Sequence, residues 1–189
     1  MGSDRATELL ASWLASVLVR WDGEGTASML AGPEAGPLPA AGPIHVLTSQ
    51  DPQGVPQPPA RNAALLAELL AWAAAELPAG TWWPATGCDP VSGHAEQGIA
   101  MAGRGRAAAT ADGARWGQLA IYELTDDELI VVACDGSPEP GAGLPRAARR
   151  WARDAPGARL DELPLEAWWA VYAPALALPT PPPPAPEGP

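Results

Sequence analysis

Two stretches rich in proline and glycine confine regular structure in this chain to the part between them. Gly32–Pro39 mixes proline and glycine with short side chains, and Pro181–Pro189 is a proline-rich tail. Repeated proline removes backbone donors and fixes φ, so neither stretch supports a helix or a sheet ladder. A chain of 189 residues with 24 prolines and 20 glycines therefore has room for one domain of ordinary size with extensions.

The pattern of hydrophobic residues divides the chain into four parts. Residues 1–42 are expected to hold an amphipathic helix over Asp4–Trp21 and then a Gly/Pro linker, because Leu10, Trp13, Leu14, Val17 and Trp21 share one helical face. Residues 43–136 are expected to form the core domain. Residues 137–179 read as a C-terminal extension with basic and Trp-rich helical segments, and residues 180–189 as a disordered Pro-rich tail.

The core segment alternates strand and helix patterns. Apolar alternation predicts strands, while an apolar stripe formed by Leu66, Leu69, Leu70, Ala73 and Leu77 predicts a long helix that Pro78 ends. The predicted order is a strand at Ile44–Thr48, a helix at Pro59–Leu77, a strand at Trp82–Trp83, a strand at His94–Met101, a helix at Gly105–Arg115, and a hairpin of Gln118–Leu124 with Glu128–Ala133.

This order of elements favours an α+β fold. Helices and strands that alternate in this way predict a mainly antiparallel sheet with helices packed on one face. The first choice of topology is a split βαββαβ arrangement, flanked by the N-terminal helix and the Pro-rich tail.

Charge and composition exclude several classes of partner. The net charge of −11 opposes binding to nucleic acid or to an anionic membrane surface, because both need a dense positive surface. Every basic residue is arginine and there is no phenylalanine, a bias typical of a GC-rich bacterial genome. The first residues lack the basic start of a signal peptide, and two cysteines make no disulfide framework, so we expect a cytoplasmic protein.

His94 and Glu96 form the first candidate pair for chemistry. Side chains alternate faces along a strand, so these two point the same way if the segment is extended. Glu96 would then raise the pKa of His94 and orient it as a general acid or base. A surface pair without chemistry is the alternative.

Four further polar residues lie where strands end or helices begin. Asn62 occupies the apolar stripe of the long helix, so its amide needs a partner, either backbone in a structural clasp or a ligand. Thr48 faces the same way as Ile44 and Val46, and Gln118 shares a face with Ala120 and Tyr122. Arg115 ends a helix, where it would bind an anionic group, cap carbonyls or pair with Glu123.

Metal and nucleophile chemistry receive less support from the sequence. Cys88, Asp89, His94 and Glu96 are potential ligands in one short segment, yet no Cys-x-x-Cys or His-x-x-x-His spacing is present. We therefore predict no metal and no cofactor. Cys88 is the only plausible thiol nucleophile. His45 is expected to be a buried or edge histidine rather than a ligand.

The same polar residues carry a resemblance to a known family. Five segments of the chain follow one another in the order of the motifs of the bacterial family called domain of unknown function 3293. They are Thr48–Pro52, Asn62, Pro84–Gly87, His94 with Glu96, and Gly117–Ile121. The chain resembles that family over about its central half. Ser49, Asp51 and Gly98 depart from the motifs. The resemblance implies a shared fold and polar cluster, and it brings no reaction with it.

Two kinds of function remain open. The first is a binding or regulatory module for a small molecule or a protein, with His94, Glu96, Asn62 and Gln118 in its polar cluster. The second is an enzyme that uses His94 as general acid or base, oriented by Glu96, on a small polar or anionic substrate. A concave pocket at the cluster distinguishes a ligand site from a surface without chemistry.

Overall fold

The computed structural model describes residues 10, 12–14, 16–21, 27–32, 40–89, 94–134, 145–148 and 150–155. The strands in these ranges are β1 (Val17–Trp21), β2 (Ala27–Gly32), β3 (Ile44–Thr48), β4 (Trp82–Cys88), β5 (Ala95–Ala102), β6 (Ala120–Leu124), β7 (Glu128–Ala133), β8 (Arg146–Ala148) and β9 (Arg150–Ala155). The helices are α2 (Pro59–Glu76) and α3 (Arg106–Arg115), and a short 3-10 turn, η1, covers Pro52–Gly54. No helix within these ranges has the length and apolar character needed to cross a lipid bilayer.

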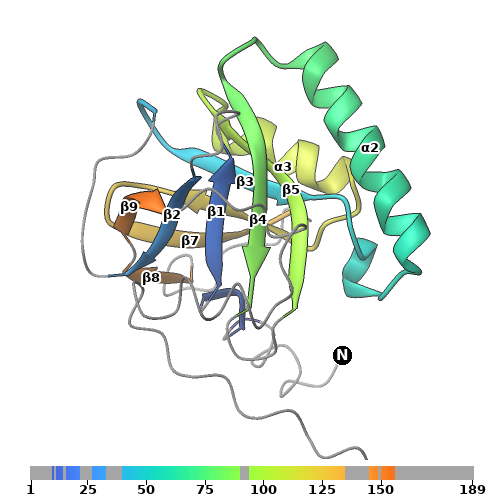
Figure 1. The fold of residues 1–189 in the computed structure, drawn as a ribbon, viewed down its shortest axis with the longest axis horizontal. Coiled ribbons are helices and arrows are strands. Elements are labelled where there is room, and N and C mark those ends of the chain that lie inside the picture. Colours follow the sequence, from blue (N-terminus) through green and yellow to red (C-terminus); the bar gives the residue numbers. More distant parts are fainter. Residues whose placement is uncertain are drawn as a thin grey trace, which may run out of the picture.

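The predicted fold class and central topology are confirmed. The segment β3-α2-β4-β5-α3-β6 is a split βαββαβ unit, with its strands in the order β6-β3-β5-β4 and all neighbours antiparallel. Both helices lie on the same side of these strands (Figure 1). Helix α2 packs against β5, and α3 packs against β6 and β3.

The sheet extends on both sides of this unit and curls on itself. Among the described residues it has nine strands, in the order β8-β7-β6-β3-β5-β4-β1-β2-β9. Strands β8 and β9 stand at opposite edges, yet only residue 149 separates them in the chain. Because consecutive Cα atoms are about 3.8 Å apart, the facing ends of the two edge strands lie within about 7.6 Å. The sheet therefore closes into a barrel-like curl around its concave face.

The two faces of the sheet bury different side chains. Leu47, Ile99, Met101, Ile121 and Ile130 face the helices, where they pack on the buried side of α2 and on Ala109 of α3. The residues that alternate with them form a second core on the concave face: Leu18, Ile44, Val46, Ala85, Ala100, Leu124, Leu129 and Val131. A period of two along the strands thus separates a helix-facing core from an interior core.

The structure corrects two details of the sequence prediction near the core. The buried face of α2 consists of Leu65, Leu69, Trp72 and Ala73, so the apolar stripe begins at Leu65 and not at Leu66. Strand β4 runs from Trp82 to Cys88, so it is five residues longer than the strand expected at Trp82–Trp83, although proline and glycine in the added segment favour a turn. Backbone pairing with β5 on one side and β1 on the other overrides the local preference for a turn there.

The N-terminal helix was predicted too long, and the core too short. Residues 17–21 form β1, which pairs with β4, and residues 27–32 form β2. Val17, Leu18 and Val19 suit an extended backbone because two of them are branched at Cβ. The sheet consequently recruits strands from both sides of the expected 43–136 core. Residues 33–39 of the linker and the tail at 180–189 lie outside the described residues.

The helical prediction for the arginine-rich segment was wrong. Residues 146–148 and 150–155 are strands, and β8 pairs with β7. The Arg146 guanidinium lies 3.2 Å from the Glu128 carboxylate on that neighbouring strand. A cross-strand partner of opposite charge stabilises β8 in a way that spacing along the sequence does not reveal.

His45 is fully buried on the helix-facing side, as expected of a histidine that is not a ligand. Its Nε2 lies 3.1 Å from Oε2 of Glu123. Arg106 donates to both oxygens of the same carboxylate, at 2.8 and 2.7 Å. Burial, the largest effect, lowers the pKa of His45, and the Arg106 hydrogen bonds lower the pKa of Glu123. These three residues join β3, β6 and α3.

Candidate functional site

A cavity of about 250 Å³ opens from the concave face of the sheet. Its apolar wall comes from interior core residues, among them Leu18, Val46, Ala85 and Val131. Small residues leave the space open, since Gly87, Gly98 and Ala120 also line it. A cavity of about 150 Å³ is known to hold benzene, so this one has room for a molecule of one or two rings.

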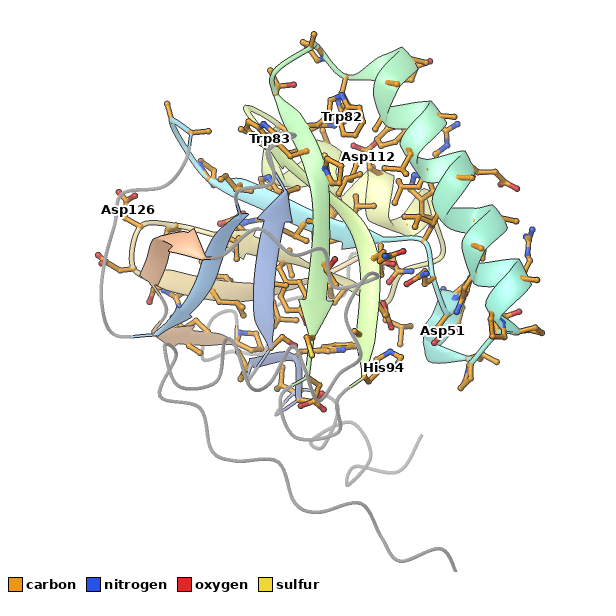
Figure 2. The ribbon with its side chains drawn as sticks, in the orientation of Figure 1. Asp51, Trp82, Trp83, His94, Asp112 and Asp126 are labelled. Atoms are coloured by element: carbon orange, nitrogen blue, oxygen red, sulfur yellow. The ribbon has the colours of Figure 1, made fainter. Side chains whose placement is uncertain are left out.

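The acidic side chains and the imidazole that line the cavity lie together at one end of the strands. Asp51, Asp89, His94 and Glu96 all contribute to the wall. Figure 2 shows Asp51 and His94 at the same end of the sheet, away from Trp82 and Trp83. The His94 side chain is 56 % exposed and that of Asp51 only 13 %, so this end is the mouth of the cavity.

His94 and Glu96 are in direct contact. Nε2 of His94 lies 2.8 Å from Oε1 of Glu96, at the start of β5, with both side chains directed as the alternation predicts. The hydrogen bond that the imidazole donates to Glu96 is the largest effect on the pKa of His94 and raises it, and the charges of Asp51 and Asp89 act in the same direction. The imidazole thus carries a proton more readily than an isolated histidine.

Asp51 also belongs to this cluster, although the sequence marked it only as a departure from the family motifs. Its Oδ2 lies 4.0 Å from Nε2 of His94. Its backbone is left-handed, with φ 45° and ψ 54°, which turns the chain back towards α2. Aspartate tolerates this conformation better than most residues do, because its short polar side chain bonds locally.

Asn62 holds Asp51 in place from the first turn of α2. Its Nδ2 donates to Oδ1 of Asp51 at 2.8 Å, and its Oδ1 accepts from the Asp51 backbone N–H at 3.0 Å. The backbone N–H of Gln57 also donates to Oδ1 of Asp51, at 2.8 Å. Oδ1 is thereby occupied, while Oδ2 faces His94. Asn62 is therefore a positioning residue for the Asp51 carboxylate, and its contacts are those of the structural clasp that the sequence offered as one of two alternatives.

Thr48 and Gln118 secure the loop that carries Asp51, and both line the cavity. The Thr48 hydroxyl donates to the Gln97 carbonyl at 2.8 Å and accepts from the Gln50 N–H at 3.0 Å. The Gln118 side chain donates to the Gln50 carbonyl at 3.1 Å. These contacts fix the loop to β5 and to the residues before β6.

Arg115 lies apart from this cluster. Its guanidinium stacks over the rings of Trp72 and Trp116, 5.6 and 5.8 Å from their centroids. It is not among the residues that line the cavity. Arg115 thus has a cation–π role between α3 and α2, and the anion-binding role has no counterpart at the mouth.

Two side chains near the cavity bear on its chemistry. Burial raises the pKa of the Cys88 thiol to about 11, with the charge of Asp89 adding to the shift. Cys88 is therefore a neutral thiol near pH 7, which removes the nucleophile that the sequence offered. Tyr122, which the sequence analysis placed only as a face neighbour of Gln118, donates to the Ser16 hydroxyl at 3.0 Å, and burial raises its pKa.

The chain was compared with family models, with curated proteins and with solved structures, and none of them matched. The resemblance to domain of unknown function 3293 thus rests on its motifs alone, and the geometry of the cavity and its mouth has to carry the functional argument.

Proposed function

We propose that this chain is a cytoplasmic small-molecule binding module whose ligand enters the cavity inside the curled sheet. The observation that carries the proposal is the division of the lining into an apolar wall and a polar mouth. Ligand sites typically combine a mostly apolar concave wall with a few fixed polar groups that set orientation. Asp51, His94 and Glu96 supply those groups here, and the loop contacts of Asn62, Thr48 and Gln118 hold the mouth in one arrangement.

The size and charge of the site restrict the ligand class. About 250 Å³ fits an apolar body of one or two rings, below the usual drug-sized pocket of about 300 Å³ or more. Three carboxylates at the mouth, those of Asp51, Asp89 and Glu96, repel an anionic head group. Amines and alcohols are therefore expected to bind better than carboxylic acids of the same shape.

A cavity-filling substitution tests the binding function. Ala120 lines the cavity, and Ala120→Leu adds bulk to its wall. Ala107→Leu is the matched control, because Ala107 is exposed on α3. The wild type and both variants are first treated with a chelator, so that no bound metal ion alters the charge of the mouth. All three are then screened by thermal shift against small aromatic and alicyclic amines, alcohols and acids. Compounds that stabilise the wild type and Ala107→Leu, but not Ala120→Leu, support the proposal. Equal stabilisation of all three proteins, or of none, refutes it.

Acid–base catalysis on the bound molecule is the second candidate. It is favoured by one observation, the 2.8 Å contact between His94 and Glu96, which resembles an imidazole held by an orienting carboxylate. A turnover of any binder that is abolished in His94→Gln, with binding retained, would establish the enzyme. Binding without turnover in wild type leaves the module as a receptor.

A further inference from the structure

We propose that Asp51, His94 and Glu96 form a binding site for one divalent transition-metal ion at the mouth of the cavity. Each of the three side chains offers one ligand atom, an imidazole nitrogen or a carboxylate oxygen, and these atoms all lie within 4.8 Å of one another. They come from two separate segments, the loop after β3 and the start of β5, so their convergence is a property of the fold. This site involves Asp51 instead of Cys88 and Asp89, and it reverses the expectation of no metal.

The separations are close to those that coordination needs. Metal–nitrogen and metal–oxygen bonds of about 2.0–2.2 Å place two neighbouring ligand atoms about 3.0–3.4 Å apart. Nε2 of His94 lies 2.8 Å from Glu96 Oε1 and 4.0 Å from Asp51 Oδ2. The first separation is slightly shorter and the second longer than this range, so side-chain adjustment would be needed to place the three ligand atoms around one ion. The exposed His94 side chain has room to adjust.

The surroundings of the site resemble the outer shell of a metal centre. Ligating carboxylates are commonly fixed by hydrogen bonds from neighbouring groups. Asp51 is fixed in this way, because Asn62 and the Gln57 backbone occupy its Oδ1 and leave Oδ2 directed at His94. The cavity lies directly behind the three ligands, since all of them line it. Three protein ligands beside a cavity leave coordination positions for water or an organic molecule, as catalytic and transport sites require.

The donor set selects the class of ion. One imidazole nitrogen with two carboxylate oxygens suits Mn²⁺, Fe²⁺ or Zn²⁺ better than Mg²⁺, which prefers an all-oxygen shell with several waters. With such an ion in place, its two positive charges neutralise the Asp51 and Glu96 carboxylates, and an oxygen donor on an organic molecule would be able to take an open coordination position. The metal site does not depend on the proposed organic ligand, because ion binding is measured without one.

Titration with Mn²⁺ followed by electron paramagnetic resonance tests the site. Mn²⁺ avoids the thiols of Cys88 and Cys134, which bind zinc more readily. We expect one ion per wild-type chain, and a loss of about tenfold or more in affinity for both His94→Ala and Glu96→Gln. Asp89→Asn is the matched control, because this carboxylate lines the same mouth but lies outside the set of three and accepts from Ser12 at 2.9 Å. It should change affinity by no more than about twofold.

The control separates coordination from simple attraction of a cation to negative charge. If Asp89→Asn weakens Mn²⁺ binding as much as Glu96→Gln does, the mouth holds only a diffuse ion atmosphere and the site is refuted. Undiminished binding to His94→Ala refutes the imidazole ligand, and no binding to folded wild type refutes the proposal entirely. Far-UV circular dichroism checks that each variant is folded, and the half-exposed position of His94 makes its removal tolerable.

Discussion

Replacing Asn62 by alanine tests whether the Asp51 loop is held from α2. The change removes two hydrogen bonds, one to the Asp51 carboxylate at 2.8 Å and one from its backbone N–H at 3.0 Å. A hydrogen bond to a charged group contributes about 1.5–3 kcal/mol and a neutral one about 0.5–1.5 kcal/mol. Their sum is an upper bound, because Asn62 is only half-buried and water reaches part of the vacated space.

Two effects reduce this sum. Alanine is a better helix former than asparagine by about 0.5 kcal/mol, and position 62 lies inside α2. The Asp51 carboxylate also keeps its bond from the Gln57 N–H, so it is not left without a partner. We therefore expect Asn62→Ala to lower the free energy of unfolding by about 2 kcal/mol. Urea denaturation followed by tryptophan fluorescence measures this value.

Arg61→Ala is the matched control for this measurement. Arg61 is the preceding residue of the same turn, and its only described ion pair, with Glu68, spans 3.9 Å between side chains that are more than half exposed. Such a pair contributes little, so the control should change the free energy of unfolding by less than about 0.5 kcal/mol. If Asn62→Ala is no more destabilising than Arg61→Ala, the loop is held by Thr48 and Gln118 alone, and the positioning role of Asn62 is wrong.

Two further predictions follow from buried groups elsewhere in the sheet. Both His45 and Glu123 have lowered pKa values, so each stabilises the fold at neutral pH, and this stability falls as the pH drops below 6.5 for His45 and below 4.5 for Glu123. Wild type should therefore lose stability between pH 6.5 and 5 more steeply than His45→Gln, which cannot take up the proton; parallel curves by urea denaturation would contradict this. Gly98→Ala should cost about 3 kcal/mol, because its Cβ would overlap the Leu47 carbonyl and lie 2.9 Å from Cα of Thr48, both backbone atoms; a loss below about 1 kcal/mol in the same assay would show that β3 and β5 can separate easily.

Local patterns in the sequence predict much of the central fold. The prediction of Ile44–Thr48 as a strand matches β3 at both ends, and the two helices are correct to within one residue at each end. Proline at the first turn of α2 and after its end marks its limits, and apolar alternation marks β6 and β7. These signals act over a few residues, so a single sequence suffices to read them.

The errors concern elements whose form depends on distant partners. The arginines at 146, 149, 150 and 153 have helical spacing, but β8 forms because it completes the edge beside β7. Likewise, β1 forms because β4 and β2 lie on either side of it. Tertiary pairing of this kind overrides intrinsic propensity, and the branched Val17 and Val19 are only a weak local signal for β1.

In the candidate site, too, features set by local sequence were predicted and features set by distant contacts were missed. Alternation along strands predicted only that His94 and Glu96 share a face, and that Thr48 and Gln118 share faces with their own strand neighbours. All four polar residues line the cavity. Asp51 was missed because its position depends on a left-handed backbone and on Asn62, eleven residues away. A signal for it was nevertheless present, since an aspartate directly after a buried strand is a common place for a functional carboxylate.

The volume of the cavity has a simple origin in the sequence. Along β5, the helix-facing positions hold the bulky Ile99 and Met101, while the interior position between them holds Ala100. Strands β4 and β6 follow the same rule, with Ala85 and Ala120 turned inward. Close packing normally fills an interior, because each missing methyl group loses contacts that stabilise the fold. Small residues at interior positions of β4, β5 and β6 therefore lower the stability of the fold and leave space inside the sheet. That space opens onto Asp51, His94 and Glu96. A ligand bound there would offset the loss of folding stability, and this is the strongest reason to look for function inside the sheet and not on its outer surface.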